Sequence, residues 1–137
     1  MKIIGIEHIG IASENLIKGN NFWEYILGIN KSITEEVEDQ GVITDIYDTG
    51  NGKIELLLSK HPDSPIARFI NKQGPGIHHI CLLVDDIENA IIELKENNVK
   101  LIGDTYSVGV EGHKVIFIHP SSTGGVLLEL AQVDSKD

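Results

Sequence analysis

The sequence repeats itself, and this repeat restricts the possible folds more than any other feature. Residues 7–12 (EHIGIA) resemble residues 78–83 (HHICLL), because both runs are short and largely apolar and carry a histidine at the second position. A helix-like stretch and then three strand-like runs follow each of them. Such self-similarity predicts two copies of one supersecondary unit, each ordered strand, helix, strand, strand, strand.

The helices are predicted from the spacing of apolar residues. In the second copy an Asp85-x-x-Glu88 capping box opens the helix. Its apolar face has spacings of three and four and consists of Ile87, Ala90, Ile91 and Leu94. In the first copy either Ser13 or Asn15 can cap the helix, and Gly28 ends it. Its rougher apolar face consists of Leu16, Trp23, Ile26 and Leu27.

The strands and the joint between the copies complete the expected α+β fold. Strands after the two helices are expected at residues 31–37, 42–47, 53–58, 100–105, 114–119 and 126–131. We expect a single domain that covers residues 1–137, with module one at about 1–60, a connecting helix at about 61–75 and module two at about 76–132, because either half alone would expose its sheet face. The two βαβββ modules would then form one curved, mostly antiparallel, eight-stranded sheet around a metal site.

Two histidines and two glutamates occupy matching points of the repeat. His8 and His79 lie in the first strand of their modules, and Glu55 and Glu129 lie in the last. If a pseudo-twofold axis relates the modules, the four side chains meet near it. Two imidazoles and two carboxylates form a mixed nitrogen and oxygen set that suits a divalent transition metal. Four protein ligands leave two positions of an octahedron for a chelating substrate.

The remaining histidines and the cysteine are expected to have other roles. His78 should face away from His79, as a core residue or a support for the site. His61, His113 and His119 lack partners in the repeat and are expected to be structural or solvated, although His113 follows the glycine-bounded turn 109–112 and can approach a ligand. Cys81 is expected to be a core thiol on the same face as His79.

Composition excludes several function classes. Eleven Lys and Arg against 21 Asp and Glu give a formal charge of -10, which argues against nucleic acid or an anionic membrane as the main partner. No apolar stretch approaches the length of a membrane span. The single cysteine fits a reducing compartment, and a charged residue comes too early at the N-terminus for a signal peptide. A cytoplasmic location is therefore expected.

These motifs resemble a known family along nearly the whole chain. The paired modules resemble the vicinal oxygen chelate superfamily of glyoxalase I, extradiol dioxygenases and bleomycin-resistance proteins, and within it the methylmalonyl-CoA epimerases. The resemblance rests on residues 6–12 (IEHIGIA), 39–42 (DQGV), 54–57 (IELL), 63–69 (DSPIARF), 76–80 (GIHHI) and 119–130 (HPSSTGGVLLEL).

The resemblance implies an isomerase that interconverts the R and S forms of methylmalonyl-CoA. It implies a homodimer with one divalent cation per chain, cobalt or alternatively manganese, nickel or zinc, held by His8, Glu55, His79 and Glu129. The cation would stabilise an enolate, and Glu129 is the expected base for one transfer of the α-proton. Arg68, Lys72 and Lys114 are candidates for contacts with the CoA phosphates, although solvated surface cations are the more ordinary interpretation.

One position departs from the family pattern. Some epimerases carry a second glutamate three residues after the glycine of the Gln-Gly-Val motif, and Thr44 stands there. Threonine is no general base near neutral pH, and the adjacent Asp45 should face the other side of its strand, so the second acid/base is unassigned. Two alternatives stay open: a glyoxalase I-type isomerase acting on a thiol hemithioacetal, and a binding protein of the same scaffold without catalysis.

Overall fold

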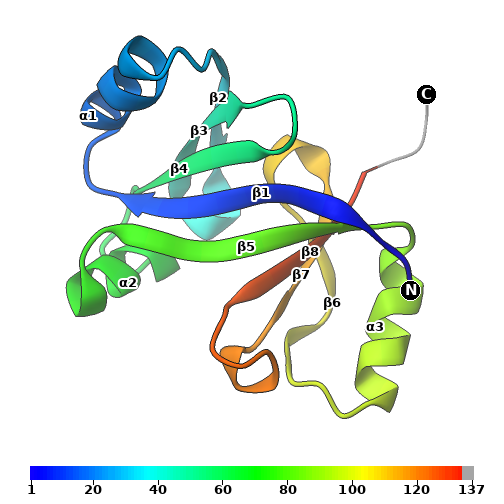
Figure 1. Ribbon diagram of the computed structural model, residues 1–137. Coiled ribbons are helices and arrows are strands. Elements are labelled where there is room, and N and C mark those ends of the chain that lie inside the picture. Colours follow the sequence, from blue (N-terminus) through cyan, green and yellow to red (C-terminus); the bar gives the residue numbers. More distant parts are fainter. Residues whose placement is uncertain (134–137) are drawn as a thin grey trace. The chain divides into compact units, whose positions relative to one another are not determined.

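The computed structural model describes residues 1–133 and contains the predicted elements in the predicted order (Figure 1). The first module consists of β1 (Ile3–Ser13), α1 (Leu16–Asn20), a π-helical segment (Asn21–Ile26), β2 (Lys31–Val37), β3 (Val42–Asp48) and β4 (Lys53–Ser59). Helix α2 (Pro65–Gln73) leads to the second module, which consists of β5 (Gly76–Val84), α3 (Ile87–Glu96), β6 (Leu101–Val108), β7 (Lys114–Ile118) and β8 (Leu128–Gln132). Within residues 1–133, no helix has both the length and the apolar composition needed to cross a membrane.

The strands pair in the same way in both modules. The strand order is β2-β3-β4-β1-β5-β8-β7-β6. In each module the last three strands are antiparallel neighbours, and the last strand runs parallel to the first. The predicted α+β fold of two βαβββ modules and eight strands is confirmed, with two parallel pairs, β1–β4 and β5–β8, that make the sheet mixed.

The chain separates into two compact units. His8–His78 form one, called here the central unit, and Met1–Glu7 together with residues 79–133 form the other, called the terminal unit. The unit boundaries fall inside β1 and β5, so the first seven residues join the unit of the second module. The expected single domain stays a prediction.

Both module helices begin with a side-chain cap, and one cap differs from the prediction. Asn15 caps α1, because its Oδ1 accepts hydrogen bonds from the backbone N–H groups of Ile17 and Lys18. Helix α3 is capped by Asp86 through the N–H of Asn89. The predicted cap at Asp85 is wrong, since Asp85 Oδ1 instead accepts a hydrogen bond from the backbone N–H of Lys2 at 3.0 Å.

The predicted apolar face of the first helix is only half correct. Leu16 and Trp23 are partly buried, whereas Ile26 is 71% and Leu27 49% exposed. The reason is the change to π-helix after Asn20, seen in the hydrogen bond from the N–H of Leu27 to the carbonyl of Phe22 five residues earlier, at 3.0 Å. This wider turn rotates the following side chains away from the α-helical face.

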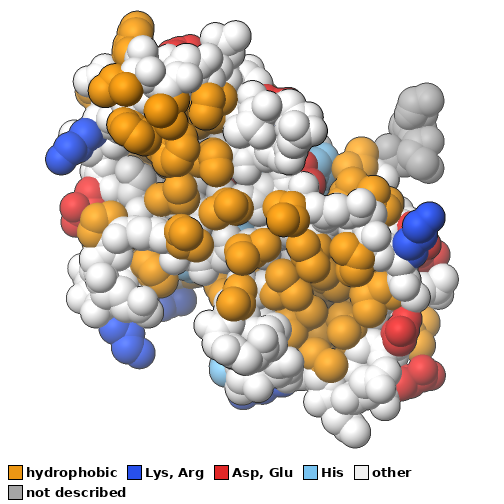
Figure 2. Space-filling view, viewed as in Figure 1, with side chains coloured by type: hydrophobic (Ala, Val, Ile, Leu, Met, Phe, Trp, Pro, Cys, Tyr) orange, Lys and Arg blue, Asp and Glu red, His pale blue; other side chains and the backbone are white. Residues whose placement is uncertain are grey.

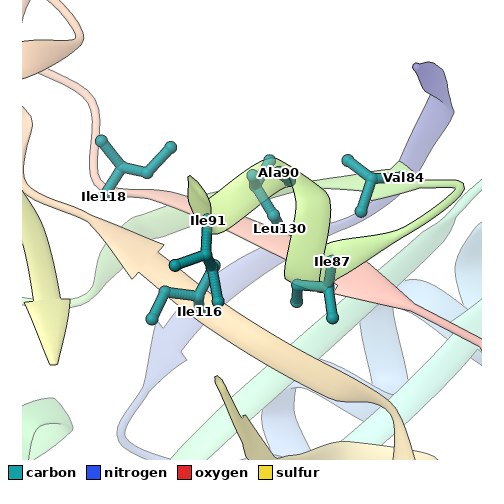
Figure 3. Close-up of a cluster of buried hydrophobic side chains, with 7 residues drawn as sticks. All are labelled: Val84, Ile87, Ala90, Ile91, Ile116, Ile118 and Leu130. Atoms are coloured by element: carbon teal, nitrogen blue, oxygen red, sulfur yellow. The ribbon is translucent and has the colours of Figure 1, made fainter. Parts of the chain in front are cut away.

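The core of the terminal unit lies between α3 and the sheet (Figure 3). The helix contributes the face that its spacing predicts, with Ile87 and Ala90 fully buried. These side chains contact inward residues of β5, β7 and β8; the cluster is Val84, Ile87, Ala90, Ile91, Ile116, Ile118 and Leu130. Because α3 covers this face, the functional side chains of β5 and β8 must occupy the opposite one.

The last strand of the second module, β8, starts later than predicted. Val126 and Leu127 precede β8, because the N–H of Val126 is held in the turn by Thr123 Oγ1 at 2.9 Å. Strand β6 runs three residues past its predicted end, with a register shift between Ile102 and Ser107 in its pairing with β7. Neither difference changes which face Glu129 occupies.

Tyr47 gives the central unit a predicted pH dependence. Its side chain is fully buried, and its hydroxyl donates a hydrogen bond to Asn20 Oδ1 at 3.0 Å. Burial, and then the charges of Asp45 and Glu24, raise the pKa of Tyr47 to about 12. Since the unfolded chain ionises near pH 10, stability should be constant below pH 10 and fall between about pH 10 and 12. Denaturant unfolding across this range measures the loss, and in Tyr47→Phe the loss should be smaller.

Candidate functional site: two buried His–Glu pairs

The first pair lies in the central unit, between β1 and β4. These strands run parallel, and Gly10 is the register partner of Glu55. His8 precedes Gly10 by two residues and shares its face, so its ring reaches the carboxylate: His8 Nδ1 lies 3.2 Å from Glu55 Oε2. His8 is 5% and Glu55 2% exposed.

The second pair lies in the terminal unit and repeats the same register. Strands β5 and β8 run parallel, and the register partner of Glu129 is Cys81, again two residues after the histidine. His79 Nε2 lies 3.1 Å from Glu129 Oε1. Phe117, opposite Glu129 in β7, packs edge-on against the His79 ring at 5.5 Å between centroids. His79 and Glu129 are also buried.

The equivalence of the pairs supports the interpretation of the repeat. In both modules a buried imidazole on the first strand contacts a buried carboxylate on the last, with the same two-residue offset. Burying a carboxylate is costly unless it is paired, so each histidine offsets part of that cost. The structure therefore brings together His8 with Glu55, and His79 with Glu129.

The chemistry of these donors fits a divalent cation. Neutral imidazole nitrogen and carboxylate oxygen are ligands of zinc, cobalt, nickel and manganese. On the faces of the pairs the neighbouring residues are small: Gly10 and Ala12 after His8, and Cys81 after His79. Cys81 is fully buried against Val115 and Ala131, as expected for a core thiol.

Strand β3 carries two further buried polar side chains, one on each face. Asp45 is 3% exposed and accepts a hydrogen bond from Thr34 Oγ1 at 2.6 Å. Thr44 is fully buried and faces the other way, as the alternation of the strand predicts. In the register of β3 with β4, Thr44 pairs with Leu57 and Ile46 pairs with Glu55. Thr44 therefore shares a face with Glu55.

The other histidines have structural contacts. The His78 ring packs edge-on against Phe69 at 5.1 Å. His119 Nδ1 accepts a hydrogen bond from the backbone N–H of Ser121 at 3.0 Å and caps a 3-10 turn. His61 is exposed, next to Gly41. These contacts agree with the expected structural roles.

A group of carboxylates around His113 was not found from the sequence. In the terminal unit, ligating atoms of Glu7, Glu111 and His113 lie within 4.8 Å of one another. Glu111 adopts a positive φ of 60° in the turn between Gly109 and Gly112, a conformation uncommon outside glycine. The glycines that flank Glu111 indicate the turn in the sequence. Glu7, however, lies about a hundred residues away and shares no motif with the turn, so no sequence pattern groups the three residues.

The candidate phosphate-binding cations differ in position. Arg68 and Lys72 are exposed on α2, where Arg68 donates a hydrogen bond to the carbonyl of Asp63. Lys114 instead lies over the Tyr106 ring, 5.2 Å from its centroid, on the face of β7 opposite to Phe117. Lys114 is therefore engaged in a cation–π contact away from the face of the His79–Glu129 pair.

Comparison with known proteins agrees with this architecture. Residues 7–117 match the model of the glyoxalase/bleomycin resistance protein/dioxygenase superfamily. The mitochondrial methylmalonyl-CoA epimerase of Bos taurus is 38% identical over 128 residues, which are 93% of this chain and 73% of that protein. The chain belongs to the methylmalonyl-CoA epimerase family of this superfamily. It is accordingly an enzyme of the isomerase class.

Solved structures of epimerases have the same fold. The methylmalonyl-CoA epimerase of Mycobacterium tuberculosis superposes with a TM-score of 0.90 and 30% identity over 95% of this chain and 88% of that one. A methylmalonyl-CoA epimerase in complex with methylmalonyl-CoA and ammonium superposes with a TM-score of 0.92 and 28% identity, over 98% of this chain and 97% of that one.

Proposed function

We propose that this chain catalyses the interconversion of R- and S-methylmalonyl-CoA. The observation that carries the proposal is the duplicated, buried His–Glu pair in a member of the epimerase family. The substrate suits removal of a proton, because its α-hydrogen lies between a thioester and a carboxylate. A relative's structure in complex with methylmalonyl-CoA supports this choice of substrate.

His8, Glu55, His79 and Glu129 are proposed to hold one divalent cation together, with cobalt as the first candidate and manganese, nickel or zinc as substitutes. Each pair alone offers two protein ligands, fewer than the usual three or four of a protein site for such metals. Two pairs with the same register supply four. When bound, the cation would act as a Lewis acid toward the oxygen atoms of the acyl group.

Glu129 is proposed as the base that removes the α-proton. Its carboxylate is buried, it contacts His79, and its second oxygen lets it serve as a ligand and still approach the substrate. Return of a proton to the opposite face of the α-carbon inverts the centre. Thr44 cannot act as the base on that face, so water, a further group, or Glu129 itself serving both faces supplies that proton.

Binding of an acyl-CoA and formation of a homodimer belong to the same proposal. A chain of net charge -10 repels a CoA at long range, so contacts with the phosphates must be local, and Arg68 and Lys72 on α2 are exposed for this purpose. The surface proposed for the homodimer includes exposed isoleucines of β1: Ile3, Ile4 and Ile6 are 47%, 57% and 59% exposed.

Figure 2 shows hydrophobic side chains gathered on the viewed face, as at surfaces that pair with a partner. A cytoplasmic location stays a prediction, with which the lone, buried Cys81 is compatible.

The decisive assay follows the α-proton. Purified protein loaded in turn with cobalt, manganese, nickel and zinc is mixed with one methylmalonyl-CoA isomer in deuterated water. We expect formation of the other isomer and deuterium at the α-carbon, and loss of both after chelation. The same preparations receive methylglyoxal with glutathione. Turnover of the hemithioacetal without any α-exchange would contradict the proposal in favour of a glyoxalase-type enzyme, and metal-free protein inert in both assays would favour a binding protein.

A further inference from the structure

The hydroxyl of Thr44 is a buried polar group without a hydrogen bond. Thr44 is fully buried, and among the described side chains of residues 1–133, which leave out that of Asp39, its Oγ1 is the one fully buried nitrogen or oxygen atom that has no hydrogen-bond partner. Folding removes such a group from water without replacing the lost hydrogen bonds. Native proteins keep few of these groups, and each one calls for an explanation, such as a ligand or ion bound nearby.

Strand register places this hydroxyl beside a proposed metal ligand. Thr44 pairs with Leu57 and Ile46 pairs with Glu55, so Thr44 and Glu55 are diagonal neighbours on one face of the sheet. Diagonal neighbours lie about 7–8 Å apart between Cα atoms, within reach of a long side chain such as glutamate. His8 also points to this face, because Gly10 is the register partner of Glu55.

We propose that Thr44 is a positioning residue whose hydroxyl donates a hydrogen bond to the carboxylate of Glu55 when Glu55 serves as a metal ligand. The inference rests on the proposed metal site. Carboxylate ligands are themselves held by hydrogen bonds from neighbouring groups, which fix their orientation and raise affinity for the metal. Since the hydroxyl has no other partner, no existing hydrogen bond must break for it to do so.

The opposite face of β3 provides an internal contrast. Thr34, an exposed residue of the neighbouring strand β2, already donates a hydrogen bond from its Oγ1 to the buried Asp45 at 2.6 Å. Removal of the Thr34 hydroxyl therefore breaks an existing hydrogen bond to a buried carboxylate. Removal of the Thr44 hydroxyl breaks none in the structure described. The two threonines should thus affect stability and metal binding in opposite ways.

The test compares Thr44→Val, which has nearly the same shape, with Thr44→Ser, which keeps the hydroxyl. Cobalt affinity is measured by competition with a chromophoric chelator, and the melting temperature is measured on metal-free protein. We expect Thr44→Val to bind cobalt about 10- to 100-fold more weakly and to melt at the same or a higher temperature than wild type. Thr44→Ser should keep the wild-type affinity within about threefold. Thr34→Val should lower the melting temperature and leave cobalt affinity unchanged.

The outcomes separate this inference from the function on which it rests. Equal cobalt affinity in wild type and Thr44→Val overturns the role of Thr44 and leaves the metal site intact. Wild-type protein that binds no divalent cation overturns both. If metal-free Thr44→Val melts well below wild type, the hydroxyl already has a structural partner in the folded protein, and the inference is overturned.

Discussion

Glu129→Gln should abolish exchange of the α-proton while the protein stays folded. The amide keeps the size of the side chain and can accept a hydrogen bond, but it cannot take a proton near neutral pH. General bases of this kind contribute about 10²- to 10⁴-fold to the rate, and loss of an anionic ligand should lower metal affinity as well. Incorporation of solvent deuterium into methylmalonyl-CoA at saturating cobalt measures the effect.

A control for this variant is available on the far face of the terminal unit. Glu88 is an exposed glutamate on α3, and Glu88→Gln removes the same charge without touching the His79–Glu129 pair. Its exchange rate should equal that of wild type. Exchange within about tenfold of wild type in Glu129→Gln, at full cobalt occupancy, would show that another group removes the proton.

His8→Gln and His79→Gln should each remove the bound cation. Glutamine can still hydrogen-bond to the neighbouring Glu55 or Glu129, so the buried carboxylate keeps a partner and the fold is preserved. Each variant loses one nitrogen ligand, and we expect cobalt affinity to fall more than about 100-fold, beyond the losses caused by residues that only support a ligand. Metal content after dialysis shows whether the cation is retained, and chelator competition measures the cobalt affinity.

The exposed His61 provides the matched control, because His61→Gln changes the histidine count without changing either pair. The two site variants matter most when compared with each other. If the two pairs hold one cation together, His8→Gln in the first module and His79→Gln in the second should lower cobalt affinity to a similar extent. Loss of cobalt in only one of them would mean that a single module holds the ion.

The repeat let the sequence predict most of the fold. Because both modules carry the same order of apolar runs and turns, all eight strands and three helices could be expected, and β2 was placed to the residue. Histidine and glutamate at matching points of the two copies also singled out the four side chains that form the two buried pairs. Their pairing depends on strand register, which the alternation of buried residues in β1 and β5 helps to fix.

What the sequence could not predict depends on contacts distant along the chain. Helix α3 is capped by Asp86 and not by Asp85, because the Asp85 carboxylate accepts a hydrogen bond from the backbone N–H of Lys2. Lys2 lies 83 residues away in the sequence. The π-helical turn after Asn20 has no local signature, so the exposure of Ile26 could not be foreseen. The lack of a hydrogen bond at Thr44 is a property of its packed surroundings, and no pattern of residues announces it.

The ligand set itself can be counted by X-ray absorption at the cobalt edge, on protein carrying one cobalt per chain. Two imidazole groups and two carboxylates from the protein are expected around the ion, and one imidazole signal should vanish in any residual complex of either histidine variant. Spectra with fewer than two imidazoles in the wild type, or a sulfur ligand from Cys81, would contradict a cation shared by the two modules.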